Sequence, residues 1–216
     1  MLFRSEPVRL RDIGCEGIRS IDQNDISFAK QFGYSIKLLA IAKKTAEGLE
    51  ARVQPTLLPK DHILSKVDGA YNAILFRADE VGDMLLYGKG AGAKPTASAV
   101  VSDLVDMAQG RPDKKANPWL TKRRLKIKSG SSIQSRYYLR FSVIDKPKVL
   151  ASISGILGDH GVSISDVIQT ERKVGNVVPL IMLTHHAGEG AVRDAVETIN
   201  RMPVIKSKSH RIRIED

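Results

Sequence analysis

The chain has 216 residues, a formal net charge of +10 and a single cysteine. Its length suits one large or two small domains, and its 42% hydrophobic content is that of a globular protein. One cysteine excludes an intrachain disulfide and a cysteine-based metal cluster, so no metal site is expected. No apolar run reaches the roughly 20 residues that span a bilayer, and the first residues do not resemble a signal peptide. We therefore expect a cytoplasmic protein with no membrane segment.

The positive charge is concentrated in one segment. Residues 1–110 carry 14 basic and 14 acidic side chains, whereas residues 111–136 alone have a net charge of +8. That segment contains Pro, Ser and Gly and separates two regions with regular apolar patterns. We interpret it as a basic linker and expect no nucleic-acid partner, because a nucleic-acid surface usually gathers its charge on a folded face. The alternative, a nucleic-acid-binding arm, predicts steep salt dependence of duplex binding.

The first region predicts a small, mostly antiparallel sheet that ends in one helix. Residues 26–33 are typical of a short helix that stops at a glycine. Strands are expected at residues 34–44, 48–59, 70–78 and 83–90. The second of these alternates through Leu49, Ala51 and Val53, after a turn at Gly48. Apolar residues then recur at helical spacing between Pro95 and Ala108.

The last region has the element order β-α-β-β-α-β. Strands are expected at residues 137–145, 162–172, 177–185 and 204–215, and helices at residues 146–161 and 190–202. This order is that of the ferredoxin-like fold, so the fold class of the whole chain is α/β, of the α+β type. Such a domain leaves one face of its four-stranded sheet free, or free to pair with a second copy.

The glycine-rich stretch GKGAGAKP, residues 88–95, opens the predicted helix and has two interpretations. Free backbone N–H groups at a helix start can hold a phosphate. The spacing, however, is neither G-x-G-x-x-G nor G-x-x-x-x-G-K-[ST], which favours a plain strand-to-helix turn.

Residues 137–214 resemble an ACT domain, a regulatory module that binds amino acids. The stretch that carries the resemblance is DKPKVLASISGILGDHGVSISDVIQ, residues 145–169. The resemblance implies an amino-acid site at a dimer interface, formed by the loop after the first strand and the start of the helix. Its effector-binding residues would be Asp145, Pro147, Val149, Leu150, His160, Val162, Ser163, Ile164 and Gln169.

Several of these residues also have ordinary structural interpretations. Asp145 is typical of a turn, His160 of a helix-end cap, and Gln169 of any strand position. The family usually has glycine where Lys148 stands here. That departure either closes the site or changes which ligand fits.

The first region resembles the carboxy-terminal half of the catalytic part of homoserine dehydrogenase. The motifs are CEGI, GYSIKLLAIAK, VQPTLLP, VDGAYNAILF and YGKGAGAKPTASAVVSDLVDMA, in this order. The resemblance therefore assigns residues 1–110 to the catalytic domain, residues 111–136 to the linker and residues 137–216 to the ACT domain. It implies NAD(P)-dependent interconversion of L-homoserine and L-aspartate 4-semialdehyde, with a pathway amino acid such as threonine as effector and a homo-oligomer, such as a dimer, formed through the ACT domain.

The resemblance also places Gly90, Ala91 and Gly92 near the nicotinamide end of the cofactor. The family's Rossmann domain, catalytic lysine and acidic homoserine-binding residues lie upstream of the position that matches CEGI. No catalytic residue is therefore assigned, and the chain alone is expected to bind no NAD(P) and to be inactive. The alternative is a stand-alone regulator, derived from this enzyme, that senses an amino acid or binds a partner.

Overall fold

The computed structural model describes residues 9–110, 127–169 and 177–215, which form two compact units. The smaller unit contains residues 61–110, and the larger one combines residues 9–60 with residues 127–169 and 177–215. Most of the expected basic linker, and the expected turn at residues 175–176, lie outside the described residues. The larger unit therefore joins the first hairpin of the chain to the βαββαβ region.

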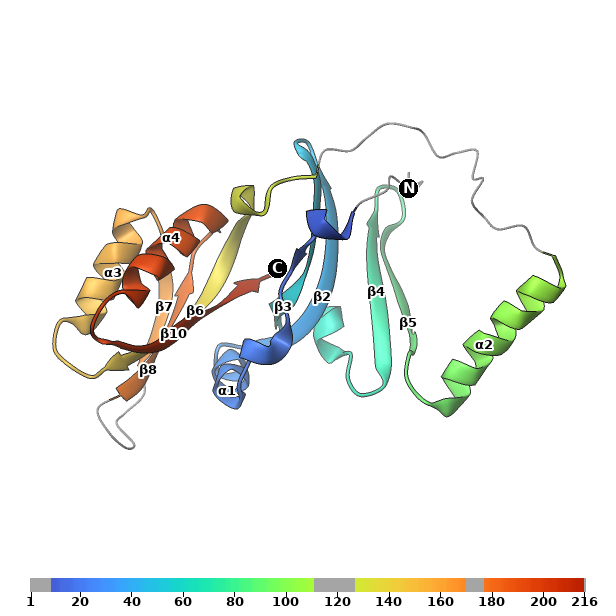
Figure 1. The fold of residues 1–216 in the computed structure, drawn as a ribbon, viewed down its shortest axis with the longest axis horizontal. Helices are drawn as coiled ribbons and strands as arrows, with labels where there is room; N and C mark the ends of the chain where they lie inside the picture. Colours follow the sequence, from blue (N-terminus) through green and yellow to red (C-terminus); the bar gives the residue numbers. More distant parts are fainter. Residues whose placement is uncertain (1–8, 111–126, 170–176, 216) are drawn as a thin grey trace. The chain divides into compact units, whose positions relative to one another are not determined.

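The βαββαβ region has the predicted ferredoxin-like fold. Its strands are β6 (Gln134–Ile144), β7 (Ile164–Gln169), β8 (Val177–Thr184) and β10 (Ile205–Ile214), and its helices are α3 (Val149–Asp159) and α4 (Glu189–Asn200). The strands are antiparallel in the order β10-β6-β8-β7. Both helices lie on the same face of this sheet (Figure 1).

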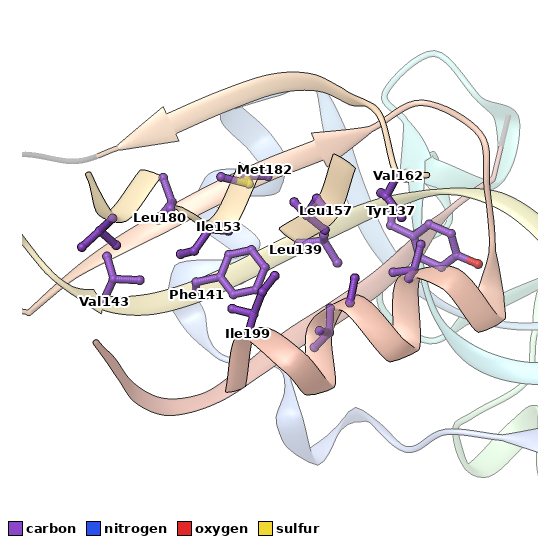
Figure 2. Packing of buried hydrophobic residues seen from close by; sticks show 14 of the residues in the cluster. Tyr137, Leu139, Phe141, Val143, Ile153, Leu157, Val162, Leu180, Met182 and Ile199 are labelled. Carbon is purple, nitrogen blue, oxygen red and sulfur yellow. The ribbon is translucent and has the colours of Figure 1, made fainter. Parts of the chain in front are cut away.

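The main core lies between this sheet and its two helices (Figure 2). Alternate residues of β6 point into it, because successive side chains of a strand face opposite sides. Phe141 from β6, Ile153 and Leu157 from α3, and Ile199 from α4 are fully buried. Each such side chain contributes roughly 1.5–3 kcal/mol of transfer free energy, so this core fixes both helices on the sheet.

The sheet continues into the first part of the chain through its last strand. The expected hairpin is present as β2 (Tyr34–Thr45) and β3 (Gly48–Pro59). Gly48 has a φ of 141°, in a region that favours glycine. Strand β3 pairs in parallel with β10, and with the short strand β1 (Gly14–Cys15). Together with β9 (Ala187–Gly188), these strands form one eight-stranded sheet.

The buried face of β3 is polar. The alternation of Leu49, Ala51 and Val53 correctly predicts the strand, but these three side chains are only half-buried. The alternate positions hold Glu50, Arg52 and Gln54, which are buried. Their side chains form ion pairs and a hydrogen bond with one another, with β10 and with the residue after it.

Arg52 is central to this network. Its Nη2 lies 2.7 Å from Oε2 of Glu215, and it also forms an ion pair with Glu50. Burial and the nearby charge of Arg213 lower the pKa of Arg52 to about 10. Arg213 in turn donates to Gln54 and lies 2.6 Å from Glu189 of α4. Pairing of buried charges of this kind offsets part of their desolvation cost.

Helix α1 (Gln23–Gln31) covers the face of the sheet that was expected to be free. Phe28 and Ala29 of α1 form a second core with Tyr138 of β6, Ile181 of β8 and Ile212 of β10. The expectation of an open face was therefore wrong. The helix also starts earlier than expected, because Asp22 caps it and forms a reciprocal capping box with Asp25.

Asp25 fastens α1 to the sheet. Its carboxylate is fully buried and accepts hydrogen bonds from Nε of Arg140 at 2.6 Å and from the hydroxyl of Tyr138 at 3.0 Å. Burial lowers the pKa of Arg140, but the hydrogen bond and charge of Asp25 outweigh it, so this pKa lies above its ordinary value. Burial, followed by the charge of Asp25, raises the pKa of the Tyr138 hydroxyl. The Arg140 guanidinium and the Tyr138 hydroxyl therefore both keep their protons at neutral pH.

The smaller unit contains a hairpin and a helix. Its elements are the 3-10 helix η3 (Ile63–Lys66), strands β4 (Tyr71–Ala78) and β5 (Gly82–Lys89), and helix α2 (Ala93–Ala108). The apolar stripe expected on α2 is present, but none of its residues is buried. Val100, Val101 and Leu104 are each more than half exposed. Among the residues that the structure describes, no helix is long and apolar enough to cross a membrane.

Replacing Asp25 by alanine should lower the free energy of unfolding by about 3–5 kcal/mol, because it leaves the buried Arg140 guanidinium without its main partner. Urea unfolding of the whole chain measures this change. Asp194→Ala is the matched control, since this carboxylate lies on the exposed side of α4 and should change stability by no more than about 0.5 kcal/mol. Equal unfolding midpoints for the two variants would contradict the assignment.

Candidate functional site

An open cavity of about 450 Å³ lies where β6 ends and α3 begins. This volume is within the range of small-molecule sites. Its lining residues come from the end of β6, the loop to α3, the first turn of α3, and single positions of β7 and β8. They are Val143, Ile144, Asp145, Lys146, Pro147, Lys148, Val149, Leu150, Gln169 and Leu180.

The floor of the cavity is apolar and its rim is polar. Val143 and Leu180 are both 1% exposed and belong to the main core. On the rim, Nε2 of Gln169 lies 3.5 Å from Oδ1 of Asp145, although the two are 24 positions apart in the sequence. The sheet thus brings an amide from β7 to a carboxylate from the loop after β6. An apolar base with a few polar groups above it is typical of small-molecule sites.

Lys148 has a left-handed backbone, with a φ of 73°. It is the one non-glycine residue with a positive φ in the described part of the chain. This conformation costs an L-residue roughly 1–2 kcal/mol and costs glycine nothing. The geometry therefore explains physically why a glycine suits this position and why a lysine there is unusual.

The first turn of α3 points its backbone donors toward the loop. No side chain caps this helix, and the amides of Leu150 and Ala151 have no acceptor within the helix. A helix start of this kind favours a carboxylate through both its N–H groups and its dipole. Together with the Asp145 carboxylate, the cavity has separate places for an anionic and a cationic group.

The structure brings together five of the nine predicted effector-binding residues, namely Asp145, Pro147, Val149, Leu150 and Gln169. The other four lie near the opposite end of α3, which is about 16 Å long. There, Nδ1 of His160 lies 2.8 Å from the carbonyl oxygen of Ile156, Val162 is buried in the core, and Ser163 and Ile164 lead into β7. His160 is thus placed as a helix-end cap in this chain, and ligand contacts by these four residues stay a prediction.

The sequence analysis missed four contributors to the cavity, namely Val143, Ile144, Lys146 and Leu180. Ile144 is the last residue of β6, and Lys146 follows Asp145 in the loop. The signal that could have found Lys146 is its position between two residues that were assigned to the site.

The glycine-rich stretch forms the turn between β5 and α2. The carbonyl oxygen of Ala70 accepts hydrogen bonds from the backbone N–H of Gly90, at 3.0 Å, and of Ala91, at 3.4 Å. These two N–H groups are therefore engaged and do not form an empty phosphate cradle. The structure supports the turn interpretation of these residues; a contact of Gly90, Ala91 and Gly92 with a cofactor stays a prediction.

At two positions of this turn the backbone requires glycine. A Cβ at Gly90 would lie 1.8 Å from Nδ2 of Asn72, on the neighbouring strand β4. Gly92 has a φ of 119°, which L-residues rarely adopt, and it precedes α2 as its N-cap. Each glycine therefore permits a close approach or a backbone angle that a side chain would disturb.

No group of three or more His, Cys, Asp or Glu side chains in the described ranges is arranged to hold a metal ion. Cys15, at the end of β1, is exposed as a free thiol. It lies apart from the residues that line the cavity.

Comparisons with known proteins find a match for each of the two regions. The family model for homoserine dehydrogenase matches residues 1–105, and the model for the ACT domain matches residues 137–203. The homoserine dehydrogenase of Helicobacter pylori is 39% identical over 211 residues, which are 96% of this chain and 49% of the relative. That of Corynebacterium glutamicum is also 39% identical, over 94% of this chain and 47% of the relative.

A solved structure gives the same result. The crystal structure of a homoserine dehydrogenase from Thiobacillus denitrificans has a TM-score of 0.77 and 39% identity, over 93% of this chain and 47% of that one. This chain thus spans about half the length of the relatives it matches, and it corresponds to their carboxy-terminal portion.

We expect Gly90→Ala to displace the Asn72 side chain and to destabilise the smaller unit by about 1–3 kcal/mol, the usual cost of forced overpacking. NMR signals of the Asn72 side-chain amide and hydrogen exchange of the Ala91 N–H measure both effects. Gly88→Ala is the matched control, because a Cβ there meets no atom within 4 Å. Unchanged Asn72 signals in Gly90→Ala would show that the turn does not depend on this contact.

Proposed function

Because this chain belongs to the homoserine dehydrogenase family and carries an ACT domain, we propose that it is the carboxy-terminal part of an NAD(P)-dependent homoserine dehydrogenase. That enzyme would interconvert L-homoserine and L-aspartate 4-semialdehyde in amino-acid biosynthesis, in the cytoplasm. The observation that carries the proposal is the ordered match of both regions, which leaves few residues of the chain unmatched.

In this proposal the chain contributes structure rather than the reacting groups. The reaction needs a cofactor that accepts or donates a hydride and a general acid/base at the homoserine hydroxyl. The sequence contains no G-x-G-x-x-G loop of the dinucleotide-binding type. The part of this chain that would contact a cofactor is the β5–α2 turn, because its residues 90–92 are exposed and two of them are glycines. Together with Ala91, these two glycines would hold the nicotinamide end against this turn and exclude water from it.

The exposed apolar stripe of α2 supports a partner domain. Val100, Val101, Leu104 and Val105 form one face of this helix and are 46–58% exposed. A contiguous apolar face of this kind usually marks an interaction surface. We assign it to contact with the dinucleotide-binding part of the complete enzyme.

The ACT domain would report the level of an amino acid. In the proposed complex, Asp145 accepts hydrogen bonds from the ligand ammonium group, and the first-turn amides of α3 bind its carboxylate. Val143 and Leu180 would contact its side chain. Strand β7 ends the sheet as described and leaves one edge for a second copy, which supports a homo-oligomer formed through this domain.

A second candidate is a stand-alone regulator that binds an amino acid or a partner enzyme. One observation favours it: α1, β2 and β3 share a sheet and a core with the ACT region, so the larger unit has a hydrophobic core of its own. In that case the amino-acid response would not depend on a catalytic domain.

The chain alone should not oxidise L-homoserine, because the reaction needs groups that we do not find in its sequence. Formation of NADH or NADPH at 340 nm, above a blank without protein, measures this directly. The Helicobacter pylori homoserine dehydrogenase serves as the positive control under the same conditions. Turnover by highly purified chain would overturn the proposed division of labour.

The chain should nevertheless bind an amino acid. Calorimetric titration with L-threonine, L-homoserine, L-methionine and L-isoleucine should show saturable binding of at least one of them. Asp145→Ala should weaken binding at least about tenfold, because it removes a charge-assisted contact. Asp194→Ala, on the exposed side of α4, is the matched control. If neither these four nor the acidic amino acids bind, the effector role fails and the ACT domain remains a dimerisation unit.

A further inference from the structure

We propose that the cavity selects an α-amino acid with a second anionic group, such as L-aspartate or L-glutamate, and that Lys148 determines this selectivity. The inference rests on the effector function proposed above and specifies its ligand. It depends on features of this chain that the family resemblance does not supply, namely the charges around the cavity and the residue at position 148.

Among the described residues that line the cavity, the charges do not balance for a neutral amino acid. Asp145 contributes one negative charge, whereas Lys146 and Lys148 contribute two positive charges. Neither lysine forms an ion pair with another described residue. A zwitterionic ligand needs one opposite charge for its ammonium and one for its carboxylate. With the α-carboxylate at the start of α3 and the ammonium at Asp145, the two lysines leave an excess of positive charge that a second anionic group on the ligand would offset.

The backbone at Lys148 gives an independent reason to assign it a role. A glycine would adopt its φ of 73° without strain, so the lysine is present at a cost to folding. Backbone strain of this kind concentrates at binding sites, where the function of the strained residue outweighs its conformational cost. Lys148 is an exposed residue of the cavity lining, and its ammonium lies at the end of a flexible four-carbon stem.

The cavity has a place for each group of such a ligand. Asp145 and Gln169 form one polar edge, which suits the ammonium group. The α-carboxylate takes the start of α3, above the apolar floor formed by Val143 and Leu180. The side-chain anion then lies within reach of Lys148. A volume of about 450 Å³ accommodates an amino acid of this size.

The alternative is that Lys148 closes the site. A Cβ in the left-handed conformation limits the approach of a ligand to the backbone of the loop. The open cavity next to this residue argues against complete closure. The open cavity favours a change of ligand, in which the ligand contacts the Lys148 ammonium group instead of the backbone of the loop.

The test compares two isosteric ligands, L-aspartate and L-asparagine, by calorimetric titration of the full chain. L-aspartate should bind at least about tenfold more tightly, because only its side chain forms a charge-assisted contact. Lys148→Met keeps the length and the backbone angle but removes the charge, and should reduce this preference to less than about twofold. Lys148→Gly should do the same and improve binding of L-threonine, since it reopens the backbone of the loop.

Lys208→Met is the matched control, because this exposed lysine lies on β10 and does not line the cavity. It should leave the preference unchanged. Equal affinity for the two isosteres, or an unchanged preference in Lys148→Met, would overturn this inference while the effector function stands. If no amino acid binds to the native chain or to Lys148→Gly, both the inference and the effector function fail.

Discussion

The parallel pairing of β3 with β10 holds the larger unit together. It joins Thr56 to Arg213 and Leu57 to Ile214, and the N–H of Glu215 donates to the carbonyl of Leu57 just beyond β10. Through these few positions the first hairpin of the chain becomes part of the ACT sheet. Both the second core under α1 and the ion pairs around Arg52 require this register, since a slip by one residue would reverse every side chain of β3.

Two buried ion clusters lie on opposite faces of this continuous sheet. On one face Arg140 pairs with Asp25, and on the other Arg213 pairs with Glu189. Buried pairs add little net stability, because desolvation offsets their attraction, but loss of one partner is costly. In this unit they link α1 and α4 to particular strands. Their effect is to make alternative placements of these helices unfavourable.

Most elements could be predicted from the sequence, because their signals are local. Gly33 and Gly161 have positive φ values and follow the ends of α1 and α3, and Gly48 has a positive φ at the turn where β3 begins. The covering of the sheet by α1 could not be predicted, because a helix of nine residues carries no information on its partner. The buried polar face of β3 was missed because alternation identifies a strand without showing which face meets charged neighbours.

The candidate site shows the same difference between local signals, which could be read from the sequence, and long-range placement, which could not. Asp145, Pro147, Val149 and Leu150 are close in sequence, so one motif could place them together. His160 and Val162 belong to the same sequence motif, but the structure places them at the other end of α3. The length of the helix separates them from the loop that lines the cavity.

The turn after β5 has a thermodynamic consequence. Since the carbonyl of Ala70 already holds the N–H groups of Gly90 and Ala91, this backbone is ordered before anything docks against it. The chain has therefore lost that conformational entropy during folding, at roughly 1–2 kcal/mol for each residue fixed. A ligand or domain that contacts the turn does not have to order it again. Preorganisation of this kind lowers the entropic cost of association.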